Sequence, residues 1–165
     1  MNFIGIDPGL TGAISLIDEE GRAQVWDTPT GRDKKRNIYM PREMNHILYD
    51  VICQDGSPST FKEAVVFIEK VHSMPKQGVA SSFNFGQGYG LWIGLVTALG
   101  LPIEYVTPQT WMKEMFRGRP IGKDASRALA QEKWPYLVDQ LNLRKHHGRS
   151  DALLIAEYGR RRYGA

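Results

Sequence analysis

The chain begins with the stretch Asn2-Phe3-Ile4-Gly5-Ile6-Asp7-Pro8-Gly9, in which an apolar run ends on an aspartate and a Pro-Gly turn. Two further apolar runs follow at residues 11–18 and 23–28, and Glu19-Glu20-Gly21 turns the chain between them. Short apolar runs that are bounded by turn residues favour strands. The N-terminal third is therefore predicted to be a three-stranded meander.

Beyond the meander, the apolar pattern predicts alternating helices and strands. Apolar residues recur at helical spacing over 44–52, whereas the continuous apolar run 64–71 is typical of a buried central strand. Thr107 before Pro108 marks a later helix start, because a hydroxyl N-cap precedes a proline whose missing N–H costs nothing there. The remaining predicted elements are a buried helix at 89–99, a short strand at 103–106 and helices at about 123–134 and 149–163. The order is βββαβαβ followed by C-terminal helices, which indicates an α/β fold.

Two segments lack periodicity and are predicted to be loops. Residues 31–37 form a basic loop, and residues 72–88 contain Pro75 and several glycines. A loop as long as the second is expected to be mobile and functional. Its Phe85-Gly86-Gln87-Gly88-Tyr89-Gly90 stretch does not match the GxGxxG pattern and does not follow a strand, so a dinucleotide site is rejected.

The composition is that of a soluble globular protein. The chain has 165 residues, 42% of them hydrophobic and 24% charged, which suits one domain over residues 1–165. The single cysteine, Cys53, excludes a disulfide framework and any multi-cysteine metal site, and it fits a reducing compartment. No apolar run approaches about 18 residues and no secretory signal begins the chain, so the expected location is the cytoplasm.

The charged residues are unevenly distributed although the net charge is only +3. Basic residues form clusters, as expected for a surface that binds a polyanion such as nucleic acid. A solvated surface without a ligand remains an alternative on charge alone. The clusters are Arg32 with Lys34, Lys35 and Arg36; Arg117 with Arg119, Lys123 and Arg127; Arg144 with Lys145 and Arg149; and Arg160 with Arg161 and Arg162.

Two acidic residues stand where strands are expected. Asp7 ends the first strand beside a tight turn, and its alternative role is to cap that turn. Glu69 lies in the apolar run of the central strand, where an unpartnered carboxylate would cost several kcal/mol. Lys70 alternates to the opposite face, so the expected partner is a metal ion or a distant base. A salt bridge to one of the arginines is the alternative for Glu69.

A third candidate site lies at the start of the last predicted helix. His147 and Asp151 are four residues apart and share a helix face, so two metal-capable side chains point together. His146, offset by five, faces elsewhere. In the alternative interpretation, Asp151 complements the positive end of the helix and His147 is solvated.

An acid after the first strand, an acid in the central strand and an acid on the C-terminal helix together resemble the RNase H and retroviral-integrase superfamily. At Asp7-Pro8-Gly9, Glu69 and His147-Gly148-Arg149-Ser150-Asp151, the chain resembles the RuvC-type Holliday junction resolvases, most closely their phage and organellar branch. The resemblance covers nearly the whole chain and includes residues 4–9, 67–69, 86–92, 108–111 and 122–127. It implies an RNase H-like fold with a mixed five-stranded sheet.

The sequence departs from this family at two positions. Many RuvC proteins have a metal ligand three residues before the final aspartate, where this chain has Gly148, and His147 is the expected substitute. Many also have an aromatic residue three positions after the central glutamate, where this chain has His72. Phe83 and Phe85 are then expected to stack on bases at the branch point, or His72 does so weakly.

The resemblance implies a nuclease that makes paired nicks in four-way DNA junctions by phosphodiester hydrolysis. Asp7, Glu69, His147 and Asp151 are the expected ligands of Mg²⁺, for which Mn²⁺ substitutes, and orientation of the attacking water is the alternative role of His147. Lys123 is expected to offset phosphate charge. Paired nicks imply a homodimer. The apolar surface of the helix at 89–99 is expected to form part of the contact, with burial of these residues in the core as the alternative. The residues expected to contact DNA are Lys34, Lys35, Arg36, His72, Lys76, Phe83, Phe85, Arg117, Arg119, Arg127 and Arg149.

Three other classes of protein share some of these features. A non-catalytic DNA-binding module would need only the basic clusters, and an RNase acting on RNA–DNA hybrids would share the carboxylates. Asp7-x-Gly9-x-Thr11 also resembles the first phosphate motif of sugar kinases and actin-like ATPases, but those proteins need two such domains and 165 residues supply one.

Overall fold

The computed structural model describes residues 1–53, 63–70 and 78–164, and a mixed five-stranded sheet lies at its centre. β1 (Asn2–Asp7), β2 (Ala13–Ile17) and β3 (Ala23–Asp27) form the expected antiparallel meander. β6 (Ala64–Glu69) pairs parallel with β1, and β7 (Ile103–Val106) pairs parallel with β6. The strand order β3-β2-β1-β6-β7 confirms the predicted sheet. Central β1 and β6 are apolar on both faces because helices cover both.

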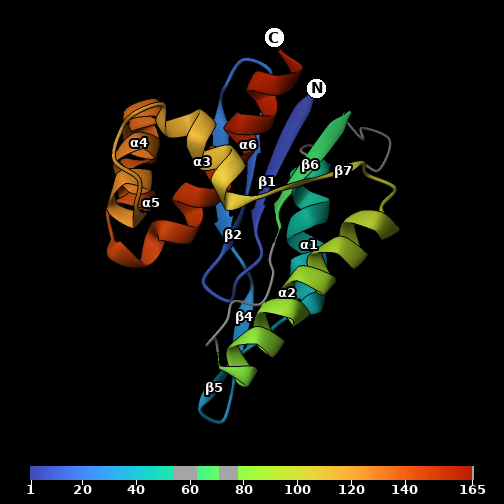
Figure 1. Ribbon diagram of the computed structural model, residues 1–165. Helices are drawn as coiled ribbons and strands as arrows, with labels where there is room; N and C mark the ends of the chain where they lie inside the picture. The colour runs from blue at the N-terminus through green and yellow to red at the C-terminus, as the bar shows by residue number, and fades with distance from the viewer. Residues whose placement is uncertain (54–62, 71–77, 165) are drawn as a thin grey trace.

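The helices form a layer on each face of the sheet (Figure 1). α1 (Pro41–Ile52) and α2 (Val79–Ala98) cover the face onto which Ile4 and Val66 point. α3 (Pro108–Phe116), α4 (Lys123–Lys133) and α6 (His147–Tyr163) cover the face of Phe3 and Phe67. The short elements η2 (Pro135–Leu137), α5 (Val138–Leu141) and η3 (Arg144–His146) connect α4 to α6. None of the helices described is long and apolar enough to cross a bilayer.

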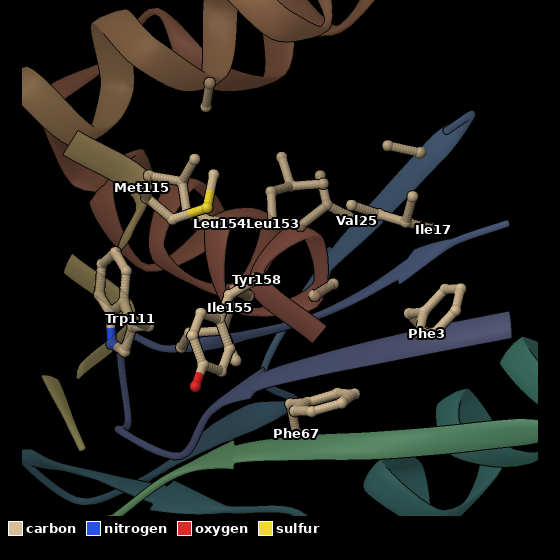
Figure 2. Close-up of a cluster of buried hydrophobic side chains, with 14 of the residues drawn as sticks. Phe3, Ile17, Val25, Phe67, Trp111, Met115, Leu153, Leu154, Ile155 and Tyr158 are labelled. Atoms are coloured by element: carbon tan, nitrogen blue, oxygen red, sulfur yellow. The ribbon is translucent and has the colours of Figure 1, made fainter. Parts of the chain in front are cut away.

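α6 packs directly on the centre of the sheet. A side chain at Gly5 of β1 would collide with the carbonyl oxygen of Ala152, so glycine permits this close approach. The Ser15 hydroxyl of β2 donates to the same carbonyl oxygen at 2.8 Å. Figure 2 shows Leu153, Leu154 and Ile155 of α6 in the core with Trp111 and Met115 of α3 and with Phe3 and Phe67 of the sheet.

Both predicted loops contain regular structure. Residues 31–37 belong to a hairpin of β4 (Thr30–Asp33) and β5 (Arg36–Tyr39), and Lys34 at its tip adopts a positive φ of 53°. The prediction of a loop over residues 72–88 is wrong from Val79 onward, because α2 begins there, ten residues before the predicted helix start. Residues 71–77 lie outside the described part of the chain. Glycines suggested a loop, but Gly88 is required inside the helix because a side chain there would collide with Pro8 and Tyr39.

Candidate active site at the carboxyl ends of β1 and β6

Asp7 and Glu69 lie side by side at the ends of two adjacent parallel strands. The register pairs Ile6 with Ile68, which places the next residues of the two strands, Asp7 and Glu69, beside each other. Asp7 lies four residues after Phe3, and Glu69 lies two residues after Phe67. Both acids therefore point to the face of the sheet that α6 covers. Two acids far apart in the sequence therefore open onto one place, at the edge of the sheet where α6 begins.

Glu69 is partly buried and bonded to an indole. The Nε1–H of Trp111 donates to Glu69 Oε2 at 2.7 Å. No lysine or arginine whose side chain is described forms an ion pair with Glu69, so the salt-bridge alternative is not found in that part of the chain. Burial, and secondarily the negative charge of Asp7, raises the pKa of Glu69 to about 7, against the opposing effect of the indole hydrogen bond.

Asp7 caps its turn and also acts electrostatically on its neighbours. Its Oδ1 accepts a hydrogen bond from the backbone N–H of Gly9 at 3.2 Å, as the turn-capping interpretation predicts. The hydroxyl of Tyr39 donates to the carbonyl oxygen of Pro8 at 3.2 Å, which ties the β4–β5 hairpin to the same turn. Burial and then the charge of Asp7 raise the pKa of Tyr39 to about 12. Turn capping and a functional role are thus compatible.

Asp151 is level with Asp7 along α6. Ala152 contacts Gly5, while Gly148 lies against Thr11 and Gly12 in the β1–β2 turn, and Asp7 falls between these contacts along the strand. At about 100° per residue, Asp151 lies about 20° from Tyr158 around the helix, and the Tyr158 ring packs 6.4 Å from Phe67 of β6. This flank of α6 therefore faces the strand that carries Glu69. The Oδ1 atom of Asp151 is shielded from solvent.

The imidazoles of both histidines hydrogen-bond to backbone groups. His147 Nδ1 is 3.4 Å from the carbonyl oxygen of Arg144, and the ring lines a surface pocket with Asp124, Arg144 and Lys145. His146 is buried and accepts a hydrogen bond from the Leu143 N–H, and burial, then nearby Arg149, lowers its pKa. A side chain at position 148, where many RuvC proteins have a ligand, would displace the β1–β2 turn.

The carboxylates fit a hard divalent cation chemically, although no complete metal cluster is preformed. No group of three or more His, Cys, Asp or Glu side chains forms a metal site among the residues described. Asp7 and Glu69 nevertheless supply oxygen donors, and no described lysine or arginine pairs with Glu69. Burial, and after it the negative charge of Asp7, raises the pKa of Glu69. A divalent cation would compensate that charge. The four-ligand set stays a prediction.

The residues expected to bind DNA fall into two groups. Lys34, Lys35 and Arg36 are exposed on the hairpin, which projects beyond the sheet (Figure 1), and none of them is ion-paired within the described chain. Phe83 and Phe85 are 71% and 38% exposed at the start of α2, and Phe85 approaches Gly9 of the Asp7 turn.

Each of the four arginines of the second group forms an ion pair with an acid of the same chain. The pairs are Arg117 with Glu114, Arg119 with Glu132 at 2.7 Å, Arg127 with Asp124 at 2.6 Å and Arg149 with Asp27 at 2.6 Å. Their charge is less available to a polyanion than the sequence clusters indicate. Lys123 begins α4, but its side chain, like His72 and Lys76, lies outside what the structure describes.

Two residues of the site were not singled out from the sequence. Trp111 lay in the family-like stretch 108–111, yet nothing in that stretch showed that its indole reaches Glu69. Tyr39 carried no signal, because its contact with Pro8 depends on the hairpin.

The mixed five-stranded sheet with its two helical layers is an RNase H-like fold, similar to that of RuvC. A structure of T. thermophilus RuvC in complex with a Holliday junction substrate is similar with a TM-score of 0.57 and 16% identity, covering 96% of this chain and 91% of that one. A second Thermus thermophilus RuvC structure is similar with a TM-score of 0.52 and 17% identity, covering 99% of this chain and 97% of that one.

One curated relative is similar in sequence. The chloroplastic Holliday junction resolvase MOC1 of Chlamydomonas reinhardtii is 33% identical over 92 residues, which are 56% of this chain and 10% of that protein. The chain thus spans about a tenth of the length of this relative. No protein-family model matches the chain. These similarities confirm the resemblance to RuvC-type resolvases found in the sequence.

Proposed function

We propose that this protein is a Holliday junction resolvase, a metal-dependent endodeoxyribonuclease that makes paired nicks in four-way DNA junctions. The observation that carries the proposal is the pair Asp7 and Glu69 at the ends of adjacent parallel strands in a RuvC fold. The name of the chloroplastic relative supports the choice of substrate.

In the proposed chemistry, Asp7, Glu69 and Asp151 bind Mg²⁺, and Mn²⁺ substitutes. The cation, when bound, supplies an activated water at neutral pH and polarises the scissile phosphodiester. His147 is assigned to the same site through rotation of its ring away from the Arg144 carbonyl, since it begins on the same flank of α6 as Asp151. Lys123 offsets charge on the phosphate.

The hairpin and the start of α2 bind the substrate in this proposal. Lys34, Lys35 and Arg36 carry positive charge for the phosphates that no acid in the described part of the chain pairs with. Phe83 and Phe85 offer exposed rings to unstacked bases. The hydrogen bond from the Tyr39 hydroxyl to the Pro8 carbonyl oxygen holds the hairpin in a fixed position next to the turn that follows Asp7.

Symmetric cleavage requires two active sites, so the active form is proposed to be a homodimer. The apolar surface of α2 supports this in part. Trp92 and Val96 are fully buried in the core, whereas Leu91, Leu95 and Leu99 are only partly covered and remain candidates for the contact.

The test is cleavage of end-labelled four-way junctions, compared with matched duplexes and RNA–DNA hybrids, in Mg²⁺ and in chelator. The wild-type protein should nick opposing junction strands only with the metal. Asp7→Asn should lose cleavage by several orders of magnitude but keep junction binding, because the carboxamide preserves shape and loses charge. Asp139→Asn, on an exposed carboxylate of α5, is the control and should cleave normally.

Three outcomes would overturn the proposal. Cleavage by Asp7→Asn at the wild-type rate would show that the pair of carboxylates is not needed for catalysis. Preference for hybrids would make the protein an RNase. Junction binding without cleavage under any metal would make it a binding module.

A further inference from the structure

Trp111 is the described residue that holds the carboxylate of Glu69. Its indole Nε1 lies 2.7 Å from Oε2, at the short end of the range for N–H···O hydrogen bonds. The indole nitrogen can only donate a hydrogen bond, so Trp111 is not itself a metal ligand. The bond occupies part of one carboxylate oxygen and leaves the other oxygen available.

The position of the Trp111 ring is set by the start of α3. Val106 of β7 is the register partner of Glu69, and α3 begins two residues later at Pro108. Thr107 caps the helix by accepting the Thr110 N–H at 3.3 Å. Trp111 is three residues after Pro108, about one helical turn into α3, and from this position its indole reaches Glu69.

The ring is immobilised by packing on its other sides. Trp111 is fully buried, and its ring centre lies 6.5 Å from that of Phe116 within the core beneath α6. A buried donor that lost its acceptor would pay its full desolvation cost, so the bond constrains both partners. Glu69 therefore has a preset orientation before any cation arrives.

We infer that Trp111 is a positioning residue, whose indole N–H orients Glu69 for binding a divalent cation. The inference rests on the proposed function and deepens it. Groups that orient metal ligands in this way commonly change metal affinity about 10–100-fold when they are removed.

The test compares Trp111→Phe with Trp134→Phe. Trp134 is the matched control because it is also buried and also donates its indole N–H, at 3.0 Å, but to the Gly21 carbonyl. Mn²⁺ binding to the DNA-free protein is measured from the electron paramagnetic resonance signal of unbound Mn²⁺. We expect Trp111→Phe to bind Mn²⁺ about 10–100-fold more weakly and Trp134→Phe to bind it as the wild type does.

A second measurement separates positioning from a general loss of structure. Junction cleavage by Trp111→Phe should recover toward the wild-type rate at saturating Mn²⁺, because the ligands themselves remain. Wild-type Mn²⁺ affinity in Trp111→Phe, an equal loss in Trp134→Phe, or failure of saturating Mn²⁺ to restore cleavage would each overturn the inference.

If Trp111→Phe does not fold, the wild-type protein provides the test. In nitrogen-15 NMR spectra, the Trp111 indole resonance should shift when Mg²⁺ is added, and the shift should vanish in Glu69→Gln, while the Trp134 indole stays constant. No response of the Trp111 indole to bound Mg²⁺ would overturn the inference. These outcomes leave the proposed function intact as long as cleavage depends on Asp7, whereas absence of junction cleavage by the wild type refutes that function directly.

Discussion

Replacing Glu69 by glutamine should stabilise the metal-free protein at high pH. The pKa of Glu69 is raised from its ordinary 4.5 to about 7 by burial and then by Asp7. Between these values the folded chain holds a proton that the unfolded chain releases, so stability falls as the pH rises through this range. Since one pKa unit corresponds to about 1.4 kcal/mol, ionised Glu69 lowers the free energy of unfolding by about 3 kcal/mol.

The difference in free energy of unfolding between Glu69→Gln and the wild type should depend on pH. Glutamine imitates the protonated acid and its carbonyl still accepts the Trp111 N–H, so the curves should meet near pH 4.5. At pH 8 in chelator, Glu69→Gln should be more stable by about 3 kcal/mol, or about 6–12 °C in Tm for a chain of this size.

Urea unfolding from pH 4.5 to 8, with Asp139→Asn as the exposed control, measures this difference. Mg²⁺ at a thousandfold excess over its Kd should reverse the order at pH 8, because a ligand that binds only the folded wild type then adds about 4.1 kcal/mol to its stability. A constant difference at every pH, or a variant that is less stable at pH 8, would refute the reasoning.

Three further predictions concern DNA binding, the histidines and assembly. The triple change of Lys34, Lys35 and Arg36 to alanine should weaken binding to all DNA and reduce the slope of log K against log salt by up to about 3. The control Arg119→Ala, which removes an ion-paired charge, should change this slope less. The slopes are measured by filter binding at several salt concentrations, and a larger change in Arg119→Ala than in the triple variant would place the hairpin away from DNA. His147→Ala should lower the cleavage rate with little change in Tm. His146→Ala should lower Tm, because it removes a buried ring that accepts the Leu143 N–H. A lower Tm in His147→Ala together with a slower cleavage rate in a stable His146→Ala would reject this assignment. Sedimentation at micromolar concentration should show a dimer, and a monomer both alone and on a junction would leave only a nickase.

Most strands and helices were predictable because their signals are local. β1 and β7 occupy the expected residues, and Thr107 with Pro108 begins α3 as predicted. The β4–β5 hairpin and the first half of α2 were not predictable. Polar hairpin residues carry no apolar alternation, and glycines in α2 have a packing role that appears only when Tyr39 and Pro8 are beside them.

The sequence by itself determined the order of elements, the clusters of basic residues and the candidate acids, because periodicity, turn residues and a carboxylate in an apolar run are properties of neighbouring positions. Only the tertiary structure decided which of these residues act on one another. The parallel pairing of β1 with β6 brings Asp7 to Glu69, and the path of α3 brings Trp111 to the same carboxylate. It also paired four of the arginines with acids. Such contacts join positions many residues apart, and their energies depend on distance and burial that no local pattern encodes.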